Sequence, residues 1–120
     1  MHIAKSNHRH VFEVKSSKGY KIVDSKEIVF LEAKGKFTIV HFADQSEIVT
    51  FHLLKWYSKI SFNPCFFRCH NSYIINFSFV DSYTNKEIVL TDGSKVPLSR
   101  NKASSFKENL KSFVLSLDSF

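Results

Sequence analysis

Residues 66–76 read FFRCHNSYIIN, and this stretch decides how the rest of the chain is interpreted. A run of five polar residues, Arg68 to Ser72, stands between two phenylalanines and the segment Tyr73-Ile74-Ile75. A buried strand does not normally carry such a run, and a solvated loop is not normally enclosed by aromatic and β-branched residues. The pattern therefore predicts a polar tip that two flanking strands hold rigidly.

Short apolar runs separated by turn residues predict antiparallel strands on both sides of this tip. Gly19, Gly35 and the pair Asp92-Gly93 mark hairpin turns, because glycine allows the backbone angles that tight turns need. The segment 24–27 has the chemistry of a turn or a short helix. The predicted strands are 11–15, 20–23, 28–31, 37–42, 47–50, 79–83, 87–90 and 95–98.

The apolar spacing becomes helical in two places. Residues 52–60 predict a short amphipathic helix that ends before Pro64, since proline cannot continue it. From Asn101 onward the spacing predicts a C-terminal helix, for which Ser99 can act as the N-cap. The residues thus predict a mainly β chain with one short central helix and one C-terminal helix. We find no internal repeat and no second domain.

Composition limits the function classes. The chain has 120 residues, 43% of them hydrophobic and 13 of them phenylalanine, which favours a globular β-rich domain over disorder. No apolar run approaches the roughly 20 residues of a membrane span, and no secretory signal is visible. We therefore expect a cytoplasmic protein without a membrane partner. The net charge of +6 favours a polyanion only weakly, and no basic arm is present.

No catalytic arrangement is visible, so the sequence predicts a protein that is not an enzyme and needs no cofactor. Cys65, Cys69 and His70 supply three ligands at most, which is too few for a structural zinc site. Arg68 and His70 flank Cys69, and nearby cations favour the reactive thiolate. Oxidation of Cys69 would then displace the tip. The alternative, which we favour, is an inert, half-buried thiol.

Four motifs in order carry a family resemblance: IVFLEAKGKFTIVHF (28–42), HLLKWYSKI (52–60), FFRCHNSYIINFSFV (66–80) and LTDGSKVPLSR (90–100). From about Tyr20 to about Leu110 the chain resembles the LytTR family of bacterial DNA-binding domains. The resemblance implies an elongated set of small antiparallel sheets packed in series. It implies one LytTR-like domain over 11–112, with an N-terminal segment and first strand over 1–19 and a helix end or tail over 113–120.

The resemblance also implies a function. Members bind double-stranded DNA through loops on one long edge, usually as output domains of response regulators that recognise direct repeats in promoters. A receiver domain or a histidine-kinase pathway would lie outside this chain, and a homodimer on the repeats is a further expectation. The three positions carried over are Asn71 in the tip, Arg100 in PLSRN and Lys36 after Gly35. Many members have Arg where Asn71 stands, and some have His where Lys36 stands.

Each site residue has a structural alternative. Lys36 is otherwise a solvated hairpin residue, Asn71 satisfies turn backbone groups, and Arg100 pairs with an acid or a helix carbonyl. Arg68 either binds phosphate or braces the tip through charge-assisted hydrogen bonds, and we favour bracing. The remaining expected phosphate contacts are Lys34, His70, Ser72, Ser99 and Lys102, of which His70 is otherwise a satisfied histidine and the serines backbone caps.

At the level of function, the alternative to a transcription regulator is a protein-interaction or inhibitory module that keeps the fold but not DNA binding. Asn71, Arg100 and the basic balance favour DNA binding.

Overall fold

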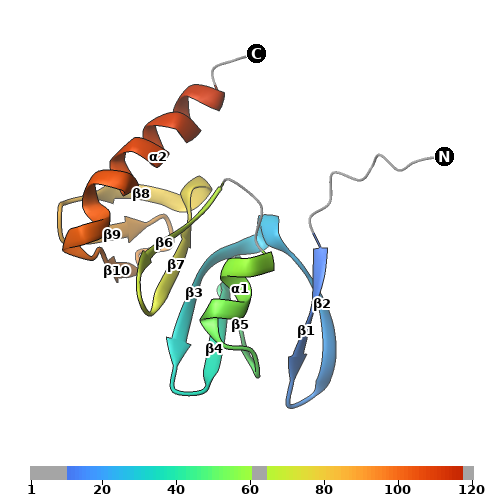
Figure 1. Ribbon diagram of the computed structural model, residues 1–120. Helices are drawn as coiled ribbons and strands as arrows, with labels where there is room; N and C mark the ends of the chain where they lie inside the picture. The colour runs from blue at the N-terminus through green and yellow to red at the C-terminus, as the bar shows by residue number, and fades with distance from the viewer. Residues whose placement is uncertain (1–10, 61–64, 118–120) are drawn as a thin grey trace.

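The computed structural model describes residues 11–60 and 65–117 and is mainly β, as expected (Figure 1). The strands are β1 (Val11–Ser16), β2 (Gly19–Asp24), β3 (Ile28–Lys34), β4 (Phe37–Phe42), β5 (Glu47–Thr50), β6 (Phe66–His70), β7 (Tyr73–Asn76), β8 (Val80–Tyr83), β9 (Glu87–Leu90) and β10 (Lys95–Pro97). The α-helices are α1 (Leu54–Ile60) and α2 (Ala103–Leu117), and the short 3-10 helices are η2 (Ser25–Glu27), η3 (Phe77–Phe79) and η4 (Arg100–Lys102).

The strands form two antiparallel sheets that follow one another along the chain. The first has the order β2-β1-β5-β4-β3-β7-β6 and the second the order β10-β9-β8. Within the first sheet, the β1–β2 hairpin is joined to β5 by the single register pair Ser16 and Thr50. The first sheet is therefore a hairpin attached to a five-stranded sheet, which agrees with the expected succession of small antiparallel sheets.

Strands β3 and β7 separate two hydrophobic cores. Leu31 pairs with Ile74 and Phe30 pairs with Ile75, and successive side chains on a strand point to opposite faces. One face packs under α1, with the buried residues Val14, Val23, Ile28, Leu31, Val40, Leu54, Tyr57 and Ile74. The other face packs against the second sheet and α2, with Val29, Phe30, Cys69, Ile75, Phe77, Ile88, Leu90, Val96, Leu98 and Phe106.

Helix α2 lies over the second sheet and extends beyond it (Figure 1). Its Phe106 side chain is fully buried, and Leu110 and Phe113 pack against the same core. Full burial of a phenylalanine contributes about 1.5–3 kcal/mol to folding, so this contact fixes the start of α2 and the loop before it. No helix in the described part of the chain is long and apolar enough to cross a membrane.

Both helices begin later than the sequence predicts. Helix α1 begins at Leu54 instead of His52, because the His52 ring stacks on Trp56 and its Nε2 accepts a hydrogen bond from the Lys15 N–H at 3.2 Å. Helix α2 begins at Ala103, after the tighter turn η4. His52 is thus used to hold β1 against α1.

Several strand boundaries also differ from the prediction by one to three residues, and two of the differences have a clear cause. Strand β3 continues to Lys34, which pairs with Phe37 across a turn of only two residues, Gly35 and Lys36. Gly35 has a φ of +62°, which glycine adopts readily and which this turn requires. Strand β8 begins one residue later than expected because η3 precedes it, capped by the Asn76 side chain.

Candidate nucleic-acid interface

The polar tip predicted from the sequence is the β6–β7 turn, and its own side chains hold it. The Arg68 Nη2 donates to the Asn71 carbonyl oxygen at 2.7 Å. The Ser72 N–H donates to His70 Nδ1 at 3.0 Å, which leaves the His70 Nε2–H to donate outward. Asn71 is exposed, and its side chain makes no hydrogen bond to any residue of 11–60 or 65–117. Only the backbone of Asn71 is used to hold the turn, so its amide side chain is available to a ligand.

Cys69 is a bulge residue in β6, and this changes its chemistry. The β6–β7 register shifts between Arg68 and His70, which leaves Cys69 without a cross-strand partner. Its side chain is 0% exposed, with Sγ 3.6 Å from the Pro97 carbonyl oxygen. Burial raises the pKa of Cys69 to about 12. The expectation of a thiolate favoured by neighbouring cations is therefore wrong, because loss of solvation outweighs them.

Two backbone hydrogen bonds join the tip to neighbouring loops. The Ala33 N–H donates to the Ser72 carbonyl oxygen at 2.8 Å, and the Ser99 N–H donates to the Cys69 carbonyl oxygen at 2.9 Å. The first bond holds the end of β3, just before the β3–β4 turn, on one side of the tip, and the second holds the β10–η4 junction on the other. The three loops that carry the predicted site residues thus lie side by side, with the tip in the middle.

The outer two loops present cations. Lys34 and Lys36 are exposed at the end of β3 and in the following turn. Arg100 is exposed as the first residue of η4, and Lys102 ends η4 half-buried. Ser99 occupies the N-cap position of η4, but its side chain makes no capping hydrogen bond, so that alternative is not observed.

No ion pair within the described residues involves the predicted cations, including Arg100. The acid nearest in register to the tip is Glu32, which pairs with Tyr73. Its carboxylate already accepts from His41 Nε2 at 2.9 Å and from the Tyr73 hydroxyl at 3.4 Å. Burial and the neighbouring Glu32 raise the pKa of Tyr73, which keeps this hydroxyl a donor. The positive charge of the three loops is therefore left for an external anion.

Three further lysines lie near these loops, and the sequence analysis missed them. Lys18 is in the β1–β2 turn, at the sheet end that also carries the β3–β4 turn, since Thr50 pairs with both Ser16 and Thr38. Lys86 and Lys107 line a hollow together with Arg100. Lys18 could have been found from sequence, because both hairpins carry a Lys-Gly pair at their turn, Lys18-Gly19 and Lys34-Gly35. Lys86 is brought near Arg100 by tertiary packing, whereas Lys107 follows Arg100 along η4 and the start of α2.

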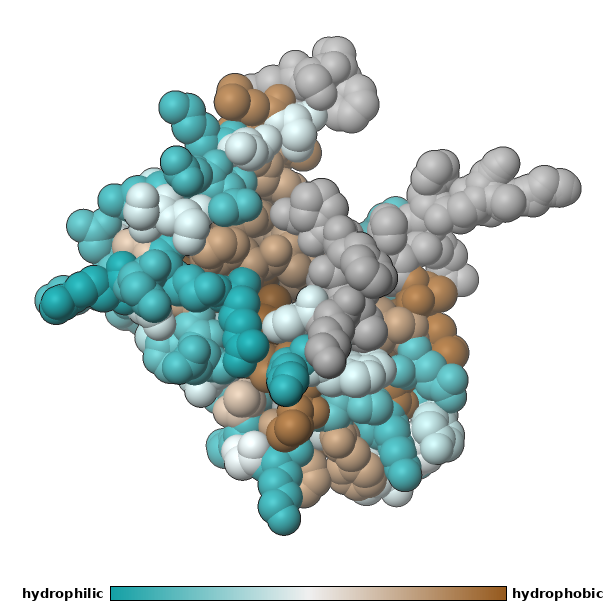
Figure 2. Space-filling view, viewed as in Figure 1, coloured by the Kyte–Doolittle hydropathy of each residue, from teal (hydrophilic) through white to brown (hydrophobic). Residues whose placement is uncertain are grey.

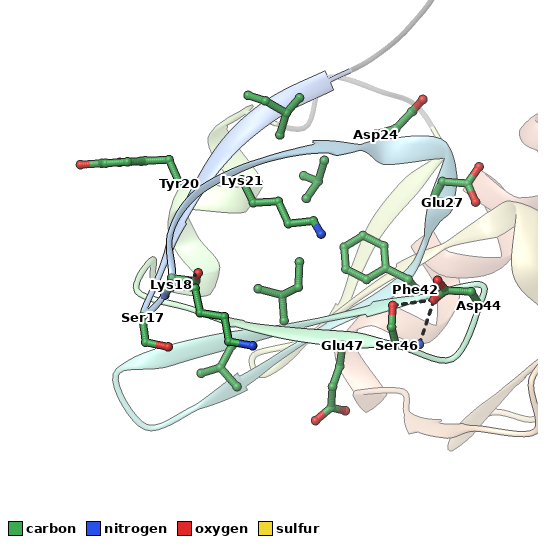
Figure 3. A pocket seen from close by; sticks show the side chains of 15 residues that line it. Ser17, Lys18, Tyr20, Lys21, Asp24, Glu27, Phe42, Asp44, Ser46 and Glu47 are labelled. Atoms are coloured by element: carbon green, nitrogen blue, oxygen red, sulfur yellow. Dashed lines mark hydrogen bonds between the residues drawn. The ribbon is translucent and has the colours of Figure 1, made fainter.

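A second hollow lies between β2 and the β4–β5 hairpin, and its charges exclude it as a polyanion site (Figure 3). Lys18 and Lys21 are the cations among its lining residues, against Asp24, Glu27, Asp44 and Glu47. Hydrogen bonds from the Ser46 hydroxyl and N–H lower the pKa of Asp44, so this carboxylate is charged at neutral pH. Within the described residues no group of three or more His, Cys, Asp or Glu side chains is placed to hold a metal ion.

Residues 18–111 match the model of the LytTr DNA-binding domain family. The chain belongs to the LytTR family of DNA-binding domains. Its structure is similar to the LytTr DNA-binding domain of a methyl-accepting/DNA response regulator from Bacillus cereus, with 27% sequence identity and a TM-score of 0.70. The match covers 83% of this chain and 95% of that domain. No curated protein matches the sequence.

Proposed function

We propose that this LytTR domain binds double-stranded DNA sequence-specifically as part of a transcription regulator. The observation that carries the proposal is the alignment of three loops by the bonds Ala33 to Ser72 and Ser99 to Cys69. An edge of this kind can follow a duplex across successive grooves. The central loop is rigid and presents a neutral amide, and the outer loops present cations that pair with no acid among the residues that the structure describes.

The three loops take different roles in the proposal. Arg100 offers two parallel donors, which match the O6 and N7 acceptors of guanine in the major groove. Asn71 is short and uncharged, which suits the narrower minor groove between two major-groove contacts, where A·T is distinguished from G·C. Lys36 is a point charge on a flexible stem and contacts either a phosphate or a base.

Most of the remaining predicted residues are assigned to contacts with the DNA backbone. Ser72 and Ser99 lie in the three loops, Lys34 and Lys102 lie next to them, and all four can donate to phosphate oxygens. His70 has its Nε2–H available for the same purpose. Arg68 is assigned to bracing, because its guanidinium donates to the Asn71 carbonyl oxygen.

The regulatory context is part of the proposal. The structurally similar Bacillus cereus domain belongs to a response regulator. By this analogy, the chain acts as the output domain of a two-component system and recognises direct repeats in promoters. A receiver domain would lie outside the chain, and two copies would occupy the two repeats. No catalytic role is proposed.

Selection of bound sequences from a random DNA pool tests this function, followed by titrations across salt. We expect a defined sequence preference. If about 6–8 phosphates are neutralised, log K should fall with log salt at a slope of roughly −5 to −7. Arg100→Ala should weaken binding to the selected site by about 1–3 kcal/mol and relax preference at one base pair. If Arg100→Ala binds the selected site as tightly as the wild-type protein, Arg100 does not contact a base there. No retained DNA at low salt would favour the interaction-module alternative.

A further inference from the structure

A hollow beside Arg100 gathers three cations from three separate elements. Lys86 comes from the β8–β9 turn, Arg100 from η4 and Lys107 from the second turn of α2. All three side chains are exposed, and no acid lines the hollow. Figure 2 shows hydrophilic residues gathered on this flank of the molecule, over the second sheet and the start of α2.

The fold fixes this arrangement. The Leu98 N–H donates to the Lys86 carbonyl oxygen at 2.9 Å, which holds the β8–β9 turn two residues from Arg100. Leu98 is itself buried in the core that includes Phe106, one residue before Lys107. The backbone positions of all three cations are therefore set by the same core. Asn85 and Ser104 also line the hollow and add uncharged donors.

Three like charges around one hollow repel one another, and no ion pair within the described residues offsets them. A surface of one sign that is concave and rich in donors is suited to an anion, because it concentrates the field and offers several N–H and O–H groups at once. The hollow adjoins the proposed DNA edge through Arg100. A duplex lying on that edge would bring its own phosphates here.

We propose that this hollow binds a backbone phosphate of the same DNA duplex, with Lys86 and Lys107 as its contacts. The inference rests on the proposed function and extends it, since neither lysine belongs to the three loops. Arg100 then stands at the border between base recognition and backbone anchoring. The bound site would extend past the base that Arg100 contacts, on the side away from Asn71.

The test compares Lys86→Ala, Lys107→Ala and their double variant with the control Lys26→Ala. Lys26 is exposed in η2, at the sheet end away from the β3–β4 and β6–β7 turns. Affinity for the selected site and for scrambled DNA is measured across salt. The double variant should reduce the salt slope by about one, because one phosphate is neutralised, and each single variant should reduce it by part of that, with similar losses on both DNAs. The control should keep the wild-type slope.

A second measurement locates the phosphate. Single methylphosphonate linkages, which are uncharged, are placed in turn along the selected site. One flanking linkage should weaken wild-type binding and leave the double variant unaffected, because the contact is already missing there. A wild-type slope in the double variant, or equal sensitivity of both proteins to every linkage, overturns the inference while the proposed function stands. Wild-type protein that binds no DNA overturns both. Melting curves of the variants should match wild type, since the replaced side chains are exposed.

Discussion

The β6–β7 tip and the β3–β4 turn end neighbouring strands of one sheet, yet they are held in different ways. In the tip, the Arg68 guanidinium donates a hydrogen bond to the Asn71 carbonyl and His70 accepts one from the Ser72 N–H. Further hydrogen bonds join the tip to the end of β3 and to the β10–η4 junction. The β3–β4 turn consists of Gly35 and Lys36, and a Cβ added at Gly35 would meet no heavy atom within 4 Å. One loop is rigid before any ligand arrives, and the other is open to solvent.

This difference indicates a division of work. A group that reads a base edge must already be oriented, because ordering it on binding costs conformational entropy. A group that meets a phosphate needs mainly charge and reach, which a flexible lysine has. We therefore expect sequence discrimination to depend on the tip, and general affinity to depend on the turn.

The largest effect should come from loosening the tip. Arg68→Ala removes the hydrogen bond to the Asn71 carbonyl, and a bond from a charged donor is worth about 1.5–3 kcal/mol. Affinity for the selected site should fall about tenfold or more, with a much smaller loss on scrambled DNA. Titrations on the two DNAs measure this difference directly.

Arg68→Lys separates the two roles of Arg68. Lysine keeps the positive charge but has no planar fork to support the turn. If Arg68 braces the tip, the lysine variant should also lose discrimination while its salt slope stays at the wild-type value. A lysine variant with wild-type discrimination, next to an alanine variant with a reduced slope, would instead assign Arg68 to phosphate.

Asn71→Ala should have a smaller effect. The Asn71 side chain makes no hydrogen bond within the described residues. Its removal therefore breaks none, and the melting temperature should stay at the wild-type value. Specific affinity should fall by about 1 kcal/mol, the low end of the range for one base contact, and the salt slope should barely change because Asn71 carries no charge. A lowered melting temperature would show that Asn71 braces the turn, and would weaken its assignment as a reader.

The sequence was enough to predict the tip itself. Polar residues between aromatic and β-branched ones indicated a supported turn, and the DG and PLSR motifs placed Arg100 just before the last helix. The hairpin turns at Gly35 and Gly93 could be predicted because glycine readily adopts the positive φ values that these turns have. The strands and helices that carry these loops were located to within about three residues.

Other features depend on packing and could not be predicted from the sequence. The alternation of side chains along a strand does not reveal a bulge. Cys69 was therefore expected to be half-buried in a polar run, whereas in the structure it lies buried in the core. The sequence gives no sign that Lys86, in the β8–β9 turn, lies beside Arg100 and Lys107. The ties between loops are backbone hydrogen bonds, which leave no residue type in the sequence to identify them.

Lys36→Ala should sharpen the comparison from the side of the turn. If Lys36 contacts phosphate, its loss should weaken binding to the selected and scrambled DNAs alike and reduce the salt slope by about one. Stability should be unchanged, since the side chain is exposed. Relaxed preference at one base pair, with the slope retained, would instead make Lys36 a base reader and contradict the division of work between the two loops.

The smallest effect on binding should come from oxidant at Cys69. Its thiol is buried beneath the tip, and burial raises its pKa from 9.0 to about 12, so almost no thiolate exists at neutral pH. In a Cys65→Ser background, peroxide that leaves the protein folded should leave both the thiol and the DNA affinity unchanged. If peroxide modifies Cys69 in folded protein and weakens DNA binding, this expectation is wrong and oxidation of Cys69 does displace the tip.

The same burial predicts a trend with pH. The unfolded chain releases the Cys69 proton near pH 9.0, whereas the folded chain keeps it until about pH 12. The folded state therefore binds more protons in this window, and its free energy of unfolding should fall as pH rises, by up to about 1.4 kcal/mol per pH unit from this group. Denaturant titrations at increasing pH measure this loss, and Cys69→Ala should show a shallower one. An equal loss in both proteins would mean that the thiol ionises in the folded state, and that the core beneath the tip admits water.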